Sequence, residues 1–372
     1  MIGIKAIGTY LPEARTSNFD RMNKFGMTES FVKHKIGFTE VAIKAPKQET
    51  SDLCVKAWED LQQNHPVTPD DIDCVIVCTQ NPDGKGLPHT SAILHEKLSL
   101  PLSCAVFDIS LGCSGYVYGL SVIKSFMEEN EFKCGLLFTA DPYSKVMNND
   151  DKKTATLFGD GATVTLLDDK PVFECGKFVF GSDGCKKEGI IVKEDGQLYM
   201  NGRAVFTFTV RVVPDNIRDI LKKNSFPLEN VDCFILHQGS LHIVNSIADS
   251  LGVSRERCPF HSAEYGNTVS SSVPMVLSRE FDKQEMINKN ITMEEVYYKI
   301  NMNYGDELSC KYNDDNSNKL IFRIRINKLK KSDGNDINIL KQIANDIREN
   351  IVIKGIKDIT SVSMYKNKNH FE

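Results

Sequence analysis

Four short apolar runs, unbroken by regular polar alternation, divide the first 278 residues of the chain. The runs cover residues 72–80, 104–110, 134–141 and 162–169, and helical patterns lie between them at 51–64, 90–100 and 114–130. Unbroken apolar runs of this length suit strands that are buried on both faces, with helices on both sides of the sheet. The alternation therefore predicts an α/β fold built on a central sheet.

A weak internal echo indicates a duplicated layout. Residues 231–252 repeat the plan of residues 104–126: an apolar strand, a small polar corner and then a helix. The first corner holds Cys113 and the second holds His237. A duplicated α/β layout would carry the two corners to neighbouring places in the fold.

Cys113 stands where an apolar run gives way to a helical pattern, with Gly112 and Gly115 close on either side. A thiol at the first turn of a helix is near the positive end of the helix dipole, which favours the thiolate. The glycines would leave room for a substrate carbonyl, and the backbone N–H of the cysteine would be one donor to an oxyanion. A nucleophile and a small buried side chain at a strand end both explain this local sequence.

His237 follows the apolar run 231–236, and Asn267 lies in the glycine-led loop 265–274. Taken singly, a histidine after a strand is often a satisfied structural residue, and an asparagine after glycine is often a turn residue. Together with Cys113, however, they supply one nucleophile and two neutral N–H donors. That set suits acyl transfer with decarboxylation, because the thiol takes the acyl group and the donors stabilise the enolate left by carbon dioxide.

Composition excludes some classes of function. The chain has 45 basic and 50 acidic residues, a net charge of −5, which argues against a nucleic-acid site. No apolar run reaches the roughly 18 residues of a membrane span, and the N-terminus lacks the pattern of a signal peptide. The eleven cysteines show no metal-finger spacing, so we expect reduced thiols, no bound metal and a cytoplasmic location.

Residues 1–278 resemble β-ketoacyl-acyl-carrier-protein synthase III, of the thiolase-like superfamily. The matching pieces occur in family order and include 3–13, 29–38, 107–120, 154–167, 236–244 and 265–277. The resemblance implies a duplicated layered fold, with halves at 1–170 and 171–278, and a homodimer formed through the first half. It implies no cofactor besides a coenzyme A or phosphopantetheine thioester as substrate.

The resemblance also implies a reaction. Cys113 would accept an acyl group from an acyl-CoA or acyl-carrier protein, and His237 and Asn267 would stabilise the carbanion derived from malonyl-acyl-carrier protein, as in fatty-acid biosynthesis. Transfer of the acyl group to an alcohol or amine is the alternative within the family. The presence of both donors favours condensation, since simple transfer does not need them.

Several positions that hold substrate in this family depart from its usual pattern. Phe31 and Lys35 stand where the resemblance implies Trp and Arg against the adenine of coenzyme A, and Lys152 stands where a third basic contact is usually Arg. Phe can still stack on a base, whereas Lys gives charge without a bidentate fork. Ser240 replaces an Asn, and Phe206 falls at an apolar position near the family's active-site tunnel. The acyl donor therefore stays open.

The composition changes near residue 279. Asn occurs 13 times in the first 278 residues and 14 times in the last 94, which contain only 3 Gly. Residues 280–366 resemble the jaw and cleft region of the largest subunit of eukaryotic RNA polymerase II. We expect a small α+β module at 279–372 that docks to polymerase subunits without catalysing a reaction.

Within this module, Thr292 and Glu295 form a predicted capping box, and residues 338–351 form a predicted helix. Strands are predicted at 319–326 and 358–366, and residues 311–319 are predicted to be a polar loop. Asp306, Asp314 and Asp315 are interpreted as solvated loop residues.

The change of sequence near residue 279 leaves the synthase part without strands that its family has. In the family, two more strands with a glycine-rich turn follow the helix after Asn267, and the turn supplies a second oxyanion donor. This chain runs from residue 278 into polymerase-like sequence instead. We therefore expect an incomplete C-terminal half, in an apparent chimera that is either a working condensing enzyme or a catalytically impaired one.

Overall fold

The computed structural model describes residues 1–288 and the segments 308–313, 321–326 and 361–366, with side chains described up to residue 280. The chain divides into two compact units, Met1–Ser278 and Arg279–Glu372. Within the described part, none of the helices combines the length and apolar character that a membrane crossing requires.

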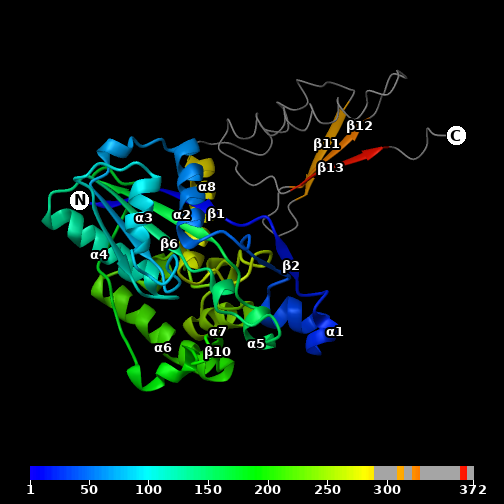
Figure 1. The fold of residues 1–372 in the computed structure, drawn as a ribbon. Helices are drawn as coiled ribbons and strands as arrows, with labels where there is room; N and C mark the ends of the chain where they lie inside the picture. Colours follow the sequence, from blue (N-terminus) through cyan, green and yellow to red (C-terminus); the bar gives the residue numbers. More distant parts are fainter. Residues whose placement is uncertain (289–307, 314–320, 327–360, 367–372) are drawn as a thin grey trace. The chain divides into compact units, whose positions relative to one another are not determined.

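The first unit is built on a six-stranded sheet with the order β5-β4-β6-β7-β1-β8. Figure 1 labels two of its strands, β1 and β6. Its strands are β1 (Gly3–Tyr10), β4 (Cys74–Cys78), β5 (Ala105–Ile109), β6 (Cys134–Ala140), β7 (Ala162–Asp168) and β8 (Phe173–Glu174). Strand β4 pairs in parallel with β5 and β6. Strand β7 runs antiparallel to both β6 and β1, so the sheet is mixed.

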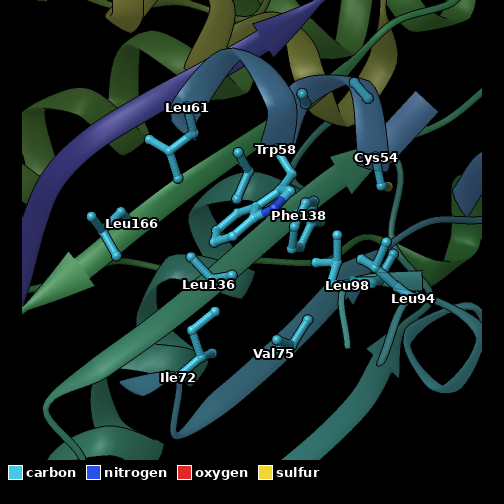
Figure 2. Close-up of a cluster of buried hydrophobic side chains, with 14 of the residues drawn as sticks. Cys54, Trp58, Leu61, Ile72, Val75, Leu94, Leu98, Leu136, Phe138 and Leu166 are labelled. Carbon is cyan, nitrogen blue, oxygen red and sulfur yellow. The ribbon is translucent and has the colours of Figure 1, made fainter. Parts of the chain in front are cut away.

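Helices cover both faces of this sheet, as predicted. Helices α2 (Thr50–Asn64) and α3 (Thr90–Lys97) bury Trp58 and Leu94 against one face, and Figure 2 shows Trp58 beside Phe138. Helix α4 (Gly115–Glu129) packs on the other face. Gly119 lies so close to the sheet there that a Cβ on it would be 2.9 Å from a methyl of Leu137. Adjacent residues of a strand point to opposite faces, so β6 is buried on both.

One strand departs from its prediction. Every residue of β5 is only half-buried, although the run 104–110 is predicted to be buried on both faces. β5 lies at the edge of the sheet, where it has one neighbouring strand, β4. All five residues of β4, which lies inside the sheet, are fully buried.

The second half of the first unit is mostly helical. Its long helices are α6 (Gly202–Lys223), α7 (Leu241–Leu251) and the first part of α8 (Ser272–Asn288). Strands β9 (Ile190–Val192) and β10 (Leu198–Met200) form a hairpin. The smaller elements of the unit are β2 (Arg15–Ser17), β3 (Glu40–Ala42), α1 (Met22–Phe25), α5 (Lys152–Ala155) and short turns of helix at Phe31–Ile36, Pro69–Asp71, Tyr143–Lys145, Gly184–Gly189, Leu228–Asn230, Arg255–Arg257 and Val269–Ser271.

The predicted strand at 231–236 is wrong. The segment is not a strand, although Phe234 and Leu236 are buried against α7 and the N–H of Phe234 donates to the carbonyl of Arg257. A strand needs a neighbour that supplies a ladder of backbone hydrogen bonds, and no described strand lies beside this segment. The internal echo is therefore realised only as a polar corner followed by a helix.

In the second unit, the described residues form the end of α8 and three strands: β11 (Leu308–Asn313), β12 (Ile321–Ile326) and β13 (Ser361–Lys366). β12 pairs antiparallel with β11 and parallel with β13, which confirms the two predicted strands. Residues 311–313, predicted as part of a loop, belong to β11 because they pair with residues 321–323 of β12. Thr292, Glu295, Asp306, Asp314, Asp315 and the predicted helix at 338–351 lie outside the described residues.

Candidate active site

The three residues with predicted catalytic roles line one cavity of about 800 Å³. Cys113 comes from the loop between β5 and α4, and His237 from the turn before α7. Asn267 comes from the loop that leads to α8. Phe31, Lys35, Phe206 and Ser240 also line this cavity, whereas Lys152 is not among its lining residues.

The environment of Cys113 disfavours the thiolate. The helix begins at Gly115, so the thiol lies just before its first turn, against an apolar cluster that includes Tyr143 and Val269. Burial raises the pKa of Cys113 to about 12, and the Asp141 carboxylate adds to this effect. The prediction of a thiolate favoured by the helix is therefore wrong, because desolvation of the sulfur outweighs the partial charge at the end of a helix.

The two glycines beside Cys113 make room for protein atoms. A Cβ at Gly115 would lie 2.3 Å from the sulfur of Cys78, and a Cβ at Gly112 would lie 2.6 Å from Oε1 of Gln80. The sequence-based explanation, space for a substrate carbonyl, is corrected accordingly. These glycines let the nucleophile loop pack closely on the carboxyl end of β4.

His237 is held as a neutral imidazole. Burial lowers its pKa to about 4, and the backbone of Val269 offsets this only in part. Nδ1 lies 2.6 Å from Oγ of Ser272, and that oxygen also accepts from the N–H of Gln238 at 3.4 Å. When the Ser272 hydroxyl donates to Nδ1, the imidazole proton is on Nε2, and this is the tautomer that the proposed reaction uses.

Asn267 is almost fully buried, and its amide orientation is fixed. Oδ1 accepts from the backbone N–H of Val269 at 2.8 Å, which leaves the NH₂ group 3.4 Å from Nε2 of His237. Val269 has a φ of +53°, a strained conformation for a β-branched residue. Nε2 of His237 and Nδ2 of Asn267 thus lie together at one side of the cavity, where N–H groups on both atoms would suit an anionic oxygen.

The remaining predicted residues form the rim of the cavity or support it. Phe206 stacks on His242 with ring centroids 4.8 Å apart and planes 2° from parallel, and Nζ of Lys35 lies 5.7 Å from the centre of the Phe206 ring. Lys152 places Nζ 5.0 Å from the centre of the Phe31 ring. Ser240 is the N-cap of α7, and its hydroxyl accepts from the N–H of Ile243.

Sequence reasoning missed several polar residues of the site. Ser272 contacts His237 directly, and the buried Asp141 lies close enough to Cys113 to affect its pKa. Lys186 and Arg203 add positive charge to the cavity lining. The run of three serines at 270–272 was the available signal, since three consecutive hydroxyls at the start of an apolar helix need partners. Among the described residues, no group of His, Cys, Asp and Glu could hold a metal ion.

Comparisons with known proteins agree with this geometry. The family model described as 3-Oxoacyl-[acyl-carrier-protein (ACP)] synthase III matches residues 107–184, and the model of its C-terminal part matches 221–294. The model described as RNA polymerase Rpb1, domain 7, matches residues 259–354 and so overlaps the second synthase match.

Two curated relatives illustrate the similarity over most of their length. Both are named beta-ketoacyl-[acyl-carrier-protein] synthase III. The protein from Deinococcus deserti is 31% identical over 293 residues, which cover 76% of this chain and 83% of the relative. The protein from Lactococcus lactis subsp. cremoris is 33% identical over 286 residues, which cover 72% of this chain and 86% of the relative.

Solved structures show the same relationship. A crystal structure of a 3-oxoacyl-(acyl-carrier-protein) synthase III matches with a TM-score of 0.71 and 33% identity, over 78% of this chain and 92% of that one. The synthase III of Thermus thermophilus matches with a TM-score of 0.70 and 30% identity, over 77% and 91% of the two chains. The chain therefore belongs to the β-ketoacyl-[acyl-carrier-protein] synthase III family of thiolase-like condensing acyltransferases.

Proposed function

We propose that this chain condenses an acyl thioester with a malonyl thioester through an acyl intermediate on Cys113. The observation that carries the proposal is the convergence of Cys113, His237 and Asn267 on one cavity, with Nε2 of His237 and Nδ2 of Asn267 3.4 Å apart. The family provides the reaction class, and the geometry supports the role proposed for each residue.

In the first half-reaction, the sulfur of Cys113 attacks the thioester carbonyl of the donor. The bond from carbon to the donor sulfur breaks, and the departing thiolate takes the proton that Cys113 loses. Because the pKa of Cys113 is raised, loss of this proton must accompany the attack rather than precede it. The backbone N–H of Cys113 is suited to stabilise the tetrahedral oxyanion.

In the second half-reaction, a malonyl thioester enters the cavity and loses carbon dioxide. The electron pair left behind forms an enolate, whose oxygen accepts hydrogen bonds from Nε2 of His237 and Nδ2 of Asn267. The enolate carbon then attacks the acyl group on Cys113, and the bond from the acyl carbon to the Cys113 sulfur breaks. The sulfur takes up a proton from water to restore the thiol, and a β-ketoacyl thioester leaves. Neutral donors suit this step, and the lowered pKa of His237 keeps its ring uncharged at pH 7.

The family assignment does not identify the carrier of the acyl donor, so the carrier is part of the proposal. Phe31 and Lys35 on the cavity rim offer a ring for stacking and a positive charge for phosphate, which suits acyl-CoA and acyl-carrier protein alike. Malonyl-acyl-carrier protein is the proposed second substrate. A cytoplasmic location is part of the same proposal, and the free thiols of the described cysteines fit a reducing compartment.

A homodimer is proposed on one observation besides the family. β5 lies at the edge of the sheet, and all of its residues are only half-buried. An exposed edge strand presents unpaired backbone groups that a second copy can cover. Light scattering on the purified chain tests this, and a monomer at micromolar concentration would contradict it.

For residues 279–372, we propose a docking role without chemistry. The match of domain 7 of RNA polymerase Rpb1 to residues 259–354 supports it, and the chimeric origin of the chain stays a prediction. Co-purification with RNA polymerase subunits tests the role. Failure of the full chain to bind any of them would remove it.

The central experiment is intact-protein mass spectrometry after incubation with a panel of acyl-CoAs and acyl-carrier proteins. We expect an acyl mass on the wild type and none on Cys113→Ala. Addition of malonyl-acyl-carrier protein should then remove that mass and yield a β-ketoacyl product. An ester or amide formed with an added alcohol or amine would favour simple transfer, and no acylation of folded protein would favour an impaired enzyme.

A further inference from the structure

Asp141 is a fully buried carboxyl group that the proposed mechanism leaves without a role. It follows directly after β6, and no described lysine or arginine forms an ion pair with it. Its oxygens instead accept hydrogen bonds, from the backbone N–H of Gln80 at 2.7 Å and from the hydroxyl of Ser270 at 2.6 Å. Burying a carboxyl group is costly, so an arrangement that keeps one here calls for an explanation.

Two partners of Asp141, Gln80 and Ser270, belong to the two sides of the active site. Gln80 follows β4 and contacts the nucleophile loop, since its side-chain oxygen fills the space beside Gly112. Ser270 belongs to the turn Val269–Ser271, between Asn267 and the serine that contacts His237. One carboxyl group thus joins the loop beside Cys113 to the loop that carries Asn267.

This connection matters because the Asn267 loop is strained. Val269, whose N–H fixes the amide of Asn267, has a positive φ, and such a conformation persists only where neighbouring contacts enforce it. Ser270 is the next residue, and its bond to Asp141 is a short, direct tie from this turn to the end of β6.

We propose that Asp141 is a positioning residue for the condensation step, acting through Ser270 to hold Asn267 at the correct distance from Cys113. The inference rests on the proposed function, because it assigns the residue to one half-reaction. It adds a group outside the three that contact substrate, and it predicts that the two half-reactions respond differently to its loss.

The two half-reactions should respond differently to Asp141→Asn because the negative charge of Asp141 affects each of them in a different way. The carboxylate raises the pKa of Cys113, so Asp141→Asn should leave acylation as fast as in the wild type or make it faster. The same change weakens the bond to Ser270, because a charge-assisted hydrogen bond is about twice as strong as a neutral one. Condensation, which needs Asn267 in place, should therefore slow down. General damage to the fold would slow both half-reactions.

A pH profile gives a second distinction. Burial raises the pKa of Asp141 to about 7, against the hydrogen bonds from Ser270, Gln80, Thr79 and Asn81 that lower it. The ionisable groups that face it, Cys78 and Cys113, have pKa values well above neutrality, and so does Tyr143. As the pH falls through 7, Asp141 becomes neutral, so condensation by the wild type should fall, and Asp141→Asn should lack this decline.

Ser271 provides a matched control. It is as buried as Ser270 and lies in the same turn, but its hydroxyl binds Thr139 and does not contact Asp141. Ser271→Ala therefore removes a buried hydroxyl from this loop without touching the proposed tie. It should lower the melting temperature without separating the two half-reactions.

The experiment measures acylation and single-turnover condensation separately, on the full chain, for the wild type, Asp141→Asn, Ser270→Ala, the double variant and Ser271→Ala. We expect each single change at Asp141 or Ser270 to slow condensation about tenfold, corresponding to about 1.4 kcal/mol, with acylation unchanged or faster. The double variant should resemble Ser270→Ala, because both changes break one interaction. Additive losses, or equal losses in both half-reactions, would overturn the proposal.

Hydrogen exchange gives a readout that does not depend on catalysis. A peptide covering residues 265–272 should exchange faster in Asp141→Asn and Ser270→Ala than in the wild type. If Cys113 takes up no acyl group but this exchange changes, the proposed function fails while the tie itself stands. Normal acylation with unchanged condensation and unchanged exchange would refute the role of Asp141.

Discussion

Ser272→Ala tests how the protein selects the tautomer of His237. The hydroxyl of Ser272 lies 2.6 Å from Nδ1, and the proposed mechanism has it donate to that nitrogen, so that the proton stays on Nε2. Removal of the hydroxyl takes this preference away. A buried hydrogen bond of this type contributes about 0.5–1.5 kcal/mol, so the fraction of the useful tautomer should fall by about two- to tenfold. The other tautomer turns a lone pair toward the enolate oxygen, so only the useful fraction supports condensation.

The expected loss of condensation rate in Ser272→Ala is therefore smaller than the loss in His237→Ala. Condensation should slow by about two- to tenfold in Ser272→Ala, compared with about 10²–10³ for His237→Ala, which removes the donor itself. Acylation of Cys113 should be unchanged, because that step does not use His237 as a donor.

Single-turnover kinetics on pre-acylated enzyme give the condensation rate, and mass spectrometry gives the acylation rate. Ser271→Ala is the control for loss of a neighbouring buried hydroxyl, and a melting curve checks that Ser272→Ala is folded. A normal condensation rate in Ser272→Ala would refute the tautomer argument. A loss as large as that of His237→Ala would show that Ser272 does more than select a tautomer.

Two further predictions follow from the environment of the site. Since the pKa of Cys113 is raised to about 12 and its proton leaves during the attack, its acylation rate should stay nearly constant between pH 6 and 9, and a tenfold rise per pH unit would mean attack by a preformed thiolate. Gly159→Ala should destabilise the fold by about 3 kcal/mol or more, because the new Cβ would lie 1.8 Å from the carbonyl oxygen of Tyr265. Gly181→Ala, with no atom within 4 Å of its Cβ, is the control for the unfolding measurement.

Much of the site could be predicted from the sequence. Distinctive short motifs mark the three residues with predicted catalytic roles. The structure brings Cys113, His237 and Asn267 to one cavity. The roles of the predicted substrate-binding residues were harder to predict, because these residues are single substitutions within a family pattern. Lys152 illustrates this: its charge lies over the ring of Phe31, and it is not among the residues that line the cavity.

The protonation of the site could not be predicted from the sequence. The helix that follows Cys113 suggested a lowered pKa, but the pKa is raised, since burial and Asp141 come from distant segments. Likewise, the serine run 270–272 gave no sign that its three hydroxyls bind three different partners: Asp141, Thr139 and His237. Desolvation and hydrogen bonding depend on which segments meet in space, and local sequence does not specify that.

The sequence by itself determined the α/β class, the strands of the first half, the helices that cover them and the identity of the reactive groups. These depend on local periodicity and on residue chemistry, which a chain carries wherever it folds. Only the tertiary structure decided that 231–236 lacks a strand, that β5 lies at an edge and that His237 is neutral with Nε2 facing Asn267. A strand requires a second strand to pair with, and a shifted pKa requires burial or a nearby charge. Residues far away in the chain supply both.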